Sequence, residues 1–178
     1  MPTTTKERLN LGCGEKKMAD AVNVDMNETV RADVVHDLNK TPYPFAANTF
    51  KQAYAYHVME HLDDLTAVMG ELFRILKPGG TITIVSPHFS YVNAYQDPTH
   101  RHYFAIGTFD YFCEQNQFQF YTEGKMRFEV VSRRIVFQPG LWKPIFESLF
   151  NRHIHFYETK LAWIFPAERV EIVLRAAK

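Results

Sequence analysis

A pair of glycines near the start of the chain could bring backbone amides against a bound ligand. They follow alternating leucines in the stretch Leu9-Asn10-Leu11-Gly12-Cys13-Gly14, a pattern that predicts a short buried strand ending in a tight turn. Because glycine has no Cβ atom, the main chain at such a turn can approach another molecule closely. Nucleotides bind at this position in open α/β folds, at the carboxyl ends of the strands. Glycine pairs also close ordinary turns, so the prediction depends on the groups around them.

Two carboxylates follow the next two predicted strands. Asp25 ends the stretch Ala21-Val22-Asn23-Val24-Asp25, and Asp37 comes directly after the predicted strand of residues 32–36. A carboxylate at a strand end can accept charge-assisted hydrogen bonds from the hydroxyl or amine groups of a ligand. Both aspartates could instead be ordinary turn residues, because aspartate is common in turns. Their order after the glycine turn favours binding.

Histidines at later strand ends offer acid–base chemistry near neutral pH. His57 ends one predicted strand, and His88 directly follows another, so we expect His88 to point into the crevice at the sheet edge. Asp97 and His100 lie in the next segment, where a carboxylate could orient a histidine that takes a hydroxyl proton. The alternative is that Asp97 begins a capped turn and the histidines pack on neighbouring aromatic rings.

The same segment holds side chains that suit zinc or iron. They are the imidazoles of His88, His100 and His102 and the carboxylate of Asp97. Their spacing matches no fixed metal motif, so we predict that the protein uses no metal. Cys13 is expected to be a small buried residue below the glycine turn rather than a nucleophile.

The elements that would position these groups alternate along the chain. Helical spacing of apolar residues predicts a helix over 62–76, and the run Lys77-Pro78-Gly79-Gly80 should end it. Strands joined by crossovers rather than hairpins favour a mostly parallel sheet. At most one helical turn fits between Gly14 and Asp25, which predicts that the first crossover helix is shortened or replaced by a loop. The strands are predicted at 8–11, 21–25, 32–36, 51–57, 81–87, 128–137 and 170–174.

The composition sets the broad class. A chain of 178 residues, 46% of them hydrophobic, predicts a single domain, and 20 basic against 20 acidic residues give no field that would attract nucleic acid or an acidic membrane. Two cysteines and no apolar leader predict a reduced, cytoplasmic location, and no apolar run is long enough to span a membrane. Aromatic residues, 15% of the chain, concentrate in the second half and indicate a pocket or an interface.

An apolar stripe at helical spacing stands out in this second half. It consists of Leu141, Trp142, Ile145, Phe146, Leu149 and Phe150. Such a stripe is usually core or a lid packed on core, and less often a membrane-facing surface. It could close a pocket or pair two subunits, so the sequence leaves a monomer and a homodimer both open.

Five short motifs occur in an order that resembles a class I S-adenosylmethionine-dependent methyltransferase. They are Leu11-Gly12-Cys13-Gly14, Val24-Asp25, His36-Asp37-Leu38, Tyr56-His57-Val58-Met59-Glu60-His61 and Leu76-Lys77-Pro78-Gly79-Gly80. The resemblance implies a Rossmann-like α/β fold, with a mostly parallel seven-stranded sheet, helices on both faces and aromatic-rich lid insertions. It also implies S-adenosylmethionine as cofactor. The loop lacks the third glycine of the fuller pattern, and no helical segment precedes the first strand.

The resemblance assigns roles along the chain. Residues 1–178 would form one domain, with the cofactor held by residues 8–87 and the acceptor or a lid supplied by residues 88–127 and 138–169. The implied cofactor-binding residues are Leu11, Gly12, Cys13, Gly14, Asp25, Asp37, Leu38 and His57, and the candidate catalytic residues are His88, His57, Asp97 and His100. Asp25 would accept the ribose hydroxyls, and Asp37 with Leu38 would meet the adenine.

The expected activity is transfer of a methyl group to an oxygen, or less readily a nitrogen, of a small polar acceptor such as a sugar or a biosynthetic intermediate. Two alternatives stay open. One is a cofactor-binding partner subunit without activity. The other is nucleic-acid methylation, for which a groove could be built from Arg101, Lys125, Arg127, Arg133 and Arg134. Zero net charge argues against nucleic acid as the partner.

Overall fold

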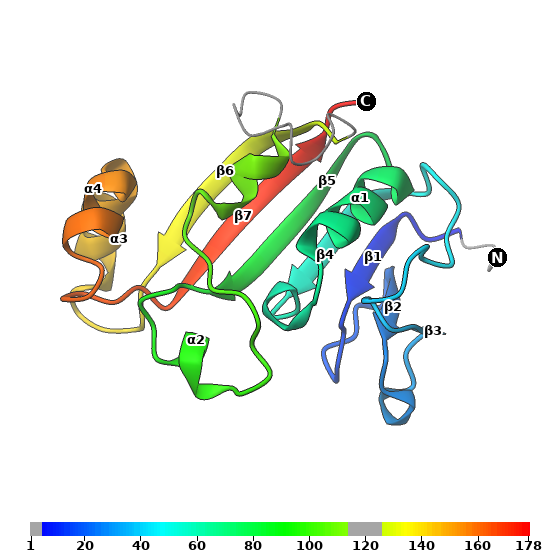
Figure 1. The fold of residues 1–178 in the computed structure, drawn as a ribbon, viewed down its shortest axis with the longest axis horizontal. Helices are drawn as coiled ribbons and strands as arrows, with labels where there is room; N and C mark the ends of the chain where they lie inside the picture. The colour runs from blue at the N-terminus through cyan, green and yellow to red at the C-terminus, as the bar shows by residue number, and fades with distance from the viewer. Residues whose placement is uncertain (1–4, 114–125) are drawn as a thin grey trace.

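The computed structural model describes residues 5–113 and 126–178, which form one seven-stranded sheet with the order β3-β2-β1-β4-β5-β7-β6 (Figure 1). The strands are β1 (Arg8–Leu11), β2 (Ala21–Asp25), β3 (Val34–Val35), β4 (Phe50–Tyr56), β5 (Leu76–Pro87), β6 (Phe128–Val136) and β7 (Arg169–Ala176). The described helices are α1 (Leu65–Ile75), α2 (Asn93–Gln96), α3 (Lys143–Arg152) and α4 (Ile154–Lys160), with 3₁₀ turns η1 (Glu28–Val30), η2 (Met59–His61) and η3 (Thr108–Phe112).

The sheet is mixed rather than uniformly parallel. The strands from β3 to β5 pair in parallel, whereas β7 runs antiparallel to both β5 and β6. This confirms the predicted α/β class with seven strands. The parallel part carries the chain from β1 to β5, so the carboxyl ends of β1, β2 and β4 lie at one edge of the sheet.

The first crossover contains no helix, as the short spacing predicts. Between β1 and β2 the chain forms turns that two buried asparagines hold in place. Asn10 donates from Nδ2 to Asn23 Oδ1 over 3.0 Å, and the Asn23 amide bonds both the N–H and the carbonyl of Met18. These side-chain hydrogen bonds pair with backbone N–H and carbonyl groups of the loop. In a crossover helix, such groups would have bonded to one another.

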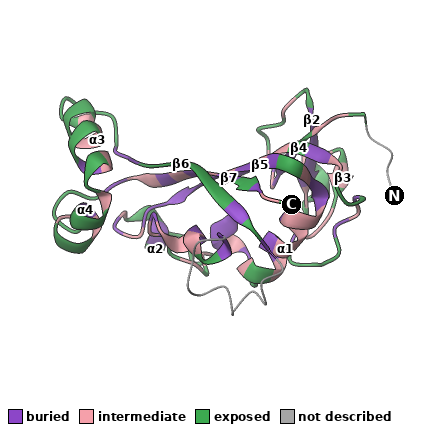
Figure 2. Ribbon diagram, turned by 90° about the horizontal axis from the view of Figure 1, so that it is seen from above, coloured by how far each residue is buried: buried purple, intermediate pink, exposed green. Residues whose placement is uncertain are grey.

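The described α-helices do not cover both faces of the sheet. In Figure 2, α1 and α2 lie on one side, and α3 and α4 lie beyond the end where β6 finishes and β7 begins. The side chains of the central strands alternate accordingly, and those on the α1 face are buried. On the other face, Tyr54, Thr83 and Val173 are half-exposed and Tyr56 is exposed. The implied helix layer on the second face is missing because β1, β2 and β3 are joined by turns and η1.

Helix α1 packs its apolar stripe on the covered face. Val68, Met69, Leu72 and Ile75 are buried there. The helix is shorter than the predicted 62–76, because the Asp64 side chain accepts hydrogen bonds from the backbone N–H groups of residues 66 and 67 and so caps it. The chain then enters β5 directly at Leu76.

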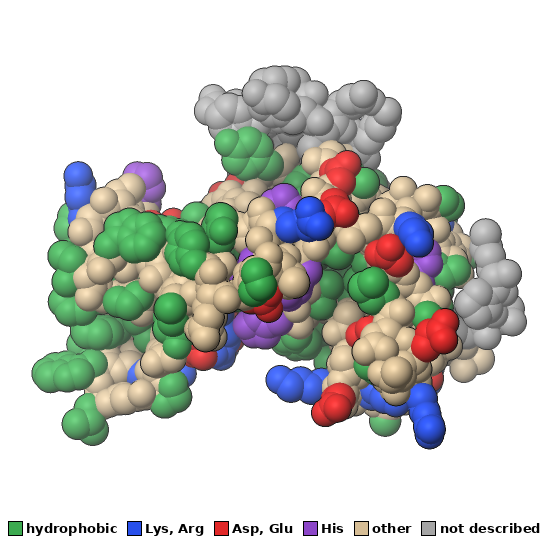
Figure 3. Space-filling view, turned by 60° about the horizontal axis from the view of Figure 1, so that its bottom comes forward, with side chains coloured by type: hydrophobic (Ala, Val, Ile, Leu, Met, Phe, Trp, Pro, Cys, Tyr) green, Lys and Arg blue, Asp and Glu red, His purple; other side chains and the backbone are tan. Residues whose placement is uncertain are grey.

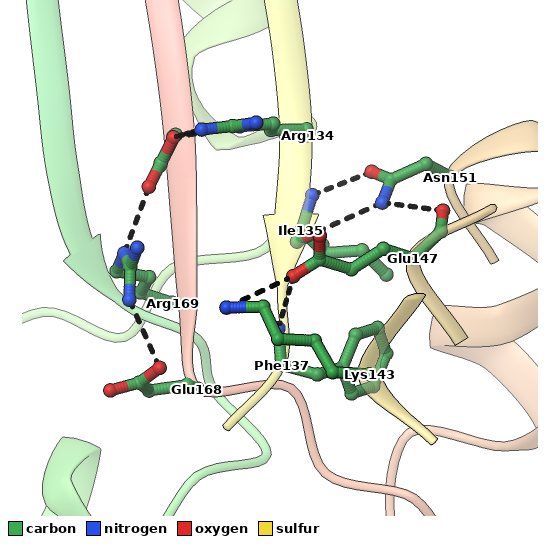
Figure 4. A network of polar contacts seen from close by, with 9 residues as sticks. Arg134, Ile135, Phe137, Lys143, Glu147, Asn151, Glu168 and Arg169 are labelled. Atoms are coloured by element: carbon green, nitrogen blue, oxygen red, sulfur yellow. Dashed lines mark hydrogen bonds and ion pairs between the residues drawn. The ribbon is translucent and has the colours of Figure 1, made fainter. Parts of the chain in front are cut away.

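Helix α3 is fastened to β6 by polar contacts (Figure 4). Asn151 bonds both the N–H and the carbonyl of Ile135, and Glu147 accepts from the Phe137 N–H. Phe150 is buried in the contact, but the rest of the apolar stripe is not core: Leu141 is 92% exposed and Trp142 65% exposed. The interpretation of the stripe as core or packed lid is therefore wrong for most of its residues. Within the described residues, no helix is long and apolar enough to cross a membrane.

Candidate functional site

A cavity of about 870 Å³ opens at the carboxyl ends of β1, β2 and β4. This first cavity has the size of sites that hold a cofactor or a drug-sized ligand. It contains Gly12 of the glycine turn, both predicted aspartates and His57, whereas Leu11, Cys13 and Gly14 do not line it. Its lining consists of Gly12, Asp25, Met26, His36, Asp37, Leu38, Asn39, His57, Val58, His61, Leu62, Pro98, Thr99, His100 and Arg101.

The glycine turn has the backbone conformation that the sequence predicts. Gly12 has φ +55°, and a Cβ atom there would lie 2.4 Å from Cγ2 of Val58, so only glycine fits. Gly14 has φ +47° with open space beside it. Leu11 and Cys13 are buried on either side of Gly12, and burial raises the pKa of the Cys13 thiol. Cys13 is therefore a buried packing residue, and the backbone of the turn faces the cavity.

Asp25 ties the turn to the end of β2. Its Oδ2 accepts the Gly14 N–H over 2.8 Å, and its Oδ1 accepts the Asn27 N–H over 2.9 Å. Each carboxylate oxygen keeps a further lone pair for a ligand hydroxyl. Asp37 is anchored in the same way by the Asn39 N–H, and Leu38 is buried in the cavity wall. The structure thus brings the predicted glycine turn and both aspartates into one cavity.

A second cavity of about 690 Å³ adjoins the first. The two share His57, His61, Pro98 and His100 in their linings. Polar side chains dominate the second cavity, whose lining consists of His57, Glu60, His61, Pro87, Tyr91, Asn93, Gln96, Asp97, Pro98, His100 and Glu168. Figure 3 shows histidine side chains gathered near the middle of one face of the molecule.

His57 stands at the junction of the two cavities in an unusual conformation. Its φ of +56° is rare for a residue other than glycine, and such strain is found at functional sites. Its Nδ1 lies 3.2 Å from Oε1 of Glu60, a side chain that is only 1% exposed, while Ser86 donates to Oε2 of Glu60 over 2.8 Å. A carboxylate accepts, so this contact places the proton on Nδ1 and leaves the Nε2 lone pair of His57 free.

Glu60 and His61 line the candidate site, but the sequence patterns gave them no role. The signal that could have found Glu60 is a carboxylate inside an otherwise apolar run, since Val58, Met59 and Leu62 around it are all buried. A buried carboxylate is costly unless it is hydrogen-bonded, and buried charges therefore mark sites.

Asp97 orients other groups through a capped turn. Its Oδ1 accepts both the N–H and the hydroxyl of Thr99, and the hydroxyl bond, followed by the N–H bond, lowers the pKa of Asp97. Thr99 Oγ1 lies 2.9 Å from Nδ1 of His61, so Asp97 supports His61 through Thr99. His100 has its Nδ1 3.1 Å from the Ala94 carbonyl oxygen. Asp97 is thus linked to His61 through Thr99, and its Oδ2 also lies 3.9 Å from Nε2 of His100.

His88 does not face the crevice. Its side chain is completely buried and belongs to the lining of neither cavity. The Ser90 N–H donates to Nδ1, so the ring proton lies on Nε2, which faces Glu158 Oε1 of α4 over 3.2 Å. The expectation that His88 points into the crevice is therefore wrong: the packing of α4 at the end of β5 turns its side chain inward.

Replacing His88 by alanine should therefore affect stability rather than catalysis. We expect the free energy of unfolding to fall by about 2 to 4 kcal/mol, because a buried ring is lost and Glu158 loses a donor. Urea unfolding of His88→Ala measures this loss. His155→Ala, an exposed histidine of the same helix as Glu158, should stay within about 0.5 kcal/mol of the parent. A His88→Ala protein with parental stability but slow turnover would restore a catalytic role.

Two other predicted groupings do not form. His88 lies apart from the cavity that His100 and Asp97 line, so the ligand set of His88, His100, His102 and Asp97 is not assembled. The arginines considered for nucleic acid are paired with acids: Arg101 with Asp63, Arg133 with Asp110 and Arg134 with Glu171. Arg127 also has a partner, and Lys125 lies outside the described residues.

Comparison with known proteins agrees with this geometry. A family model described as "Methyltransferase domain" matches residues 9–84. Sterol 24-C-methyltransferase erg6 of Schizosaccharomyces pombe is 38% identical over 63 residues, which cover 35% of this chain and 15% of that protein. Sterol 4-C-methyltransferase strm-1 of Caenorhabditis elegans is 30% identical over 100 residues, 56% of this chain and 28% of that protein. The matches thus span less than a third of these relatives.

The fold has a similar solved counterpart. The crystal structure of a SAM-dependent methyltransferase from Archaeoglobus fulgidus matches with a TM-score of 0.62 and 20% identity, covering 94% of this chain and 85% of that one. S-adenosylmethionine is the cofactor of this family, and the first cavity fits it. At Gly12 a Cβ atom would fill space beside the backbone, and the Asp25 carboxylate can accept hydrogen bonds from ligand hydroxyls. Residues 9–84 therefore match a methyltransferase domain, and the whole fold is similar to that of a SAM-dependent methyltransferase.

Proposed function

We propose that the protein transfers a methyl group to an oxygen of a small polar acceptor, such as a sugar or a biosynthetic intermediate. The observation that carries this proposal is the polar second cavity, which shares a wall with the first. When bound, S-adenosylmethionine supplies an electrophilic methyl group on a sulfonium leaving group. An acceptor in the second cavity would lie beside the residues that both cavities share.

The residues of the first cavity would hold the cofactor. The backbone at Gly12 and Gly14 would lie against the ribose and the amino-acid tail, and Asp25 would accept the ribose hydroxyls. Asp37 and Leu38 would meet the adenine. Leu11 and Cys13 support the turn from below because both are buried.

His57 is the best placed group to take a proton from the acceptor. Glu60 holds its Nδ1, so its Nε2 lone pair is free at the junction of the cavities. A positioned base matters only where the acceptor must lose a proton, as a hydroxyl must. Asp97 and His100 also line the second cavity and would position the acceptor there. Alignment of nucleophile and methyl group supplies much of the remaining acceleration.

A carbon acceptor in an apolar molecule is the second candidate. Both reported relatives are named sterol C-methyltransferases, and exposed apolar side chains gather over α3 and α4 at one end of the molecule (Figure 3). The lining of the second cavity favours the polar acceptor instead, because a sterol would leave its carboxylates and amides without partners. The single domain, the cytoplasmic location, and the choice between monomer and homodimer stay predictions.

An acceptor screen tests the proposal. Purified protein is incubated with S-adenosylmethionine and panels of hydroxylated sugars, sterols and quinones, and the demethylated cofactor and the methylated product are followed by mass spectrometry. We expect turnover with a hydroxylated polar acceptor and none with sterols. Turnover with sterols or quinones alone would replace the first candidate by the second. Cofactor binding without turnover on any acceptor would favour the inactive partner subunit.

A further inference from the structure

Three side chains that could bind a metal ion meet at the wall between the two cavities. One carboxylate oxygen of Glu60 and one ring nitrogen each of His61 and His100 all lie within 4.8 Å of one another. His61 and His100 line both cavities, and Glu60 lines the second. We propose that these three residues bind one divalent transition-metal ion, such as zinc or iron.

Hydrogen bonds already set both imidazoles in the form that a metal needs. The Ala94 carbonyl can only accept, so His100 carries its proton on Nδ1 and keeps a lone pair on Nε2. Thr99 donates its hydroxyl proton to Asp97 and therefore accepts from Nδ1 of His61. Histidines that ligate metals almost always donate their other ring N–H to an oxygen in this way. The two rings are held edge to face, 4.7 Å apart.

Glu60 supplies the negative charge that would attract the metal cation. Its side chain is 1% exposed, with Oε1 facing His57 Nδ1 and Oε2 accepting from Ser86. Each oxygen has a lone pair left after these bonds. A buried carboxylate is stabilised by a neighbouring cation, and two neutral imidazoles with one carboxylate are a donor set that suits zinc and non-haem iron.

The spacing is close to what an ion requires. Zinc lies about 2.0–2.2 Å from nitrogen and oxygen ligands, so two ligand atoms of a tetrahedral site are about 3.3–3.6 Å apart. The ligand atoms of Glu60, His61 and His100 lie within 4.8 Å of one another, so shifts of about 1 Å would bring them to this spacing. Three protein ligands leave coordination positions open toward the second cavity. If the proposed function holds, the ion would polarise an acceptor hydroxyl there, as Lewis-acid metal ions do.

This inference departs from the sequence-based prediction that no metal is used. It also rests on a different set of residues from the one considered there, since only His100 is common to both. Glu60 and His61 are adjacent in the chain, but His100 comes from the segment after α2, and the fold brings the two together.

Cobalt titration tests the site directly. Tag-free protein is treated with a chelator, dialysed and titrated with Co²⁺, whose visible absorption reports coordination by nitrogen. We expect one saturable site, with an affinity that falls at least about tenfold in Glu60→Gln and in His100→Ala. His155→Ala, an exposed histidine on α4, is the matched control and should bind like the parent. Circular dichroism confirms that each variant is folded.

Two results would overturn the metal site: Co²⁺ affinity unchanged in folded His100→Ala, or no saturable binding by the folded parent protein. Because His100 is less buried than Glu60, its variant remains informative even if Glu60→Gln fails to fold. Binding of S-adenosylmethionine and methyl transfer are measured on the same preparations. Methyl transfer without Co²⁺ binding refutes only the metal site, whereas Co²⁺ binding without methyl transfer refutes only the proposed function.

Discussion

Gly12→Ala is expected to abolish measurable binding of S-adenosylmethionine and to lower the free energy of unfolding by about 2 to 5 kcal/mol. The added Cβ would lie 2.4 Å from Cγ2 of Val58, and φ is +55° at this position, so both the turn and its neighbour must move. Gly12 lines the first cavity, where the proposed cofactor would approach its backbone. Calorimetric titration with the cofactor and urea unfolding measure the two effects.

Gly14→Ala is the matched control. Gly14 also has a positive φ, +47°, but no atom lies within 4 Å of the position that a Cβ would take, so only the backbone strain of about 1 to 2 kcal/mol applies. Adding Val58→Ala to Gly12→Ala should recover part of the lost stability, because the steric clash is removed while the strain stays. Equal losses of unfolding free energy in the two glycine variants would contradict a steric clash between a Cβ at position 12 and Val58. The same holds if Val58→Ala recovers no stability in the Gly12→Ala protein.

Asp25→Ala is expected to weaken S-adenosylmethionine binding about a hundredfold. The sequence alone predicts at least about a tenfold loss, since one carboxylate that binds a ribose hydroxyl is removed. The structure adds a second cost: Asp25 also accepts the N–H groups of Gly14 and Asn27, so its removal loosens the loop that forms the floor of the cavity. Isothermal titration of the parent and variant measures the change.

Asp20→Ala provides the control for charge. Asp20 lies in the same loop region, is exposed and pairs with Arg8, but belongs to the lining of neither cavity. Its removal should change the cofactor affinity less than about threefold, because an exposed pair contributes little. Unchanged affinity in folded Asp25→Ala would remove the assignment of Asp25 to the ribose.

The wall between the cavities is where the two proposals meet. His57, His61 and His100 all line both cavities, so the residues proposed to hold the cofactor and those proposed to hold the acceptor share this wall. His57 depends on Glu60 for its orientation, and His61 depends on Thr99. A substitution at this wall is therefore expected to affect both binding events, whereas Asp25 and Gly12 report on the cofactor side alone.

The predicted elements were close to the observed ones where local pattern decides. The strand and glycine turn at 8–14 and the strand ending at Asp25 are present, and the first crossover contains no helix. The third predicted strand, 32–36, is reduced to Val34–Val35, because only β2 pairs with this edge strand. The predicted helix loses its first residues to the Asp64 cap.

By itself the sequence located the first cavity of this protein, where the cofactor is proposed to bind. Gly12, Gly14, Asp25, Asp37 and Leu38 follow strand ends in order, and parallel strands bring their carboxyl ends to one edge whatever the rest of the fold does. Such positions depend on neighbours in the chain, so short patterns are enough to identify them.

Only the tertiary structure decided the acceptor side. His88 turns inward because it meets Glu158, which lies 70 residues away in the chain. His100 lies near Glu60 because the segment after β5 folds back over η2. The exposure of Leu141 and Trp142 depended on which element packs against α3. Side-chain directions outside regular strands are set by such long-range packing, and a residue's neighbours in sequence carry no record of it.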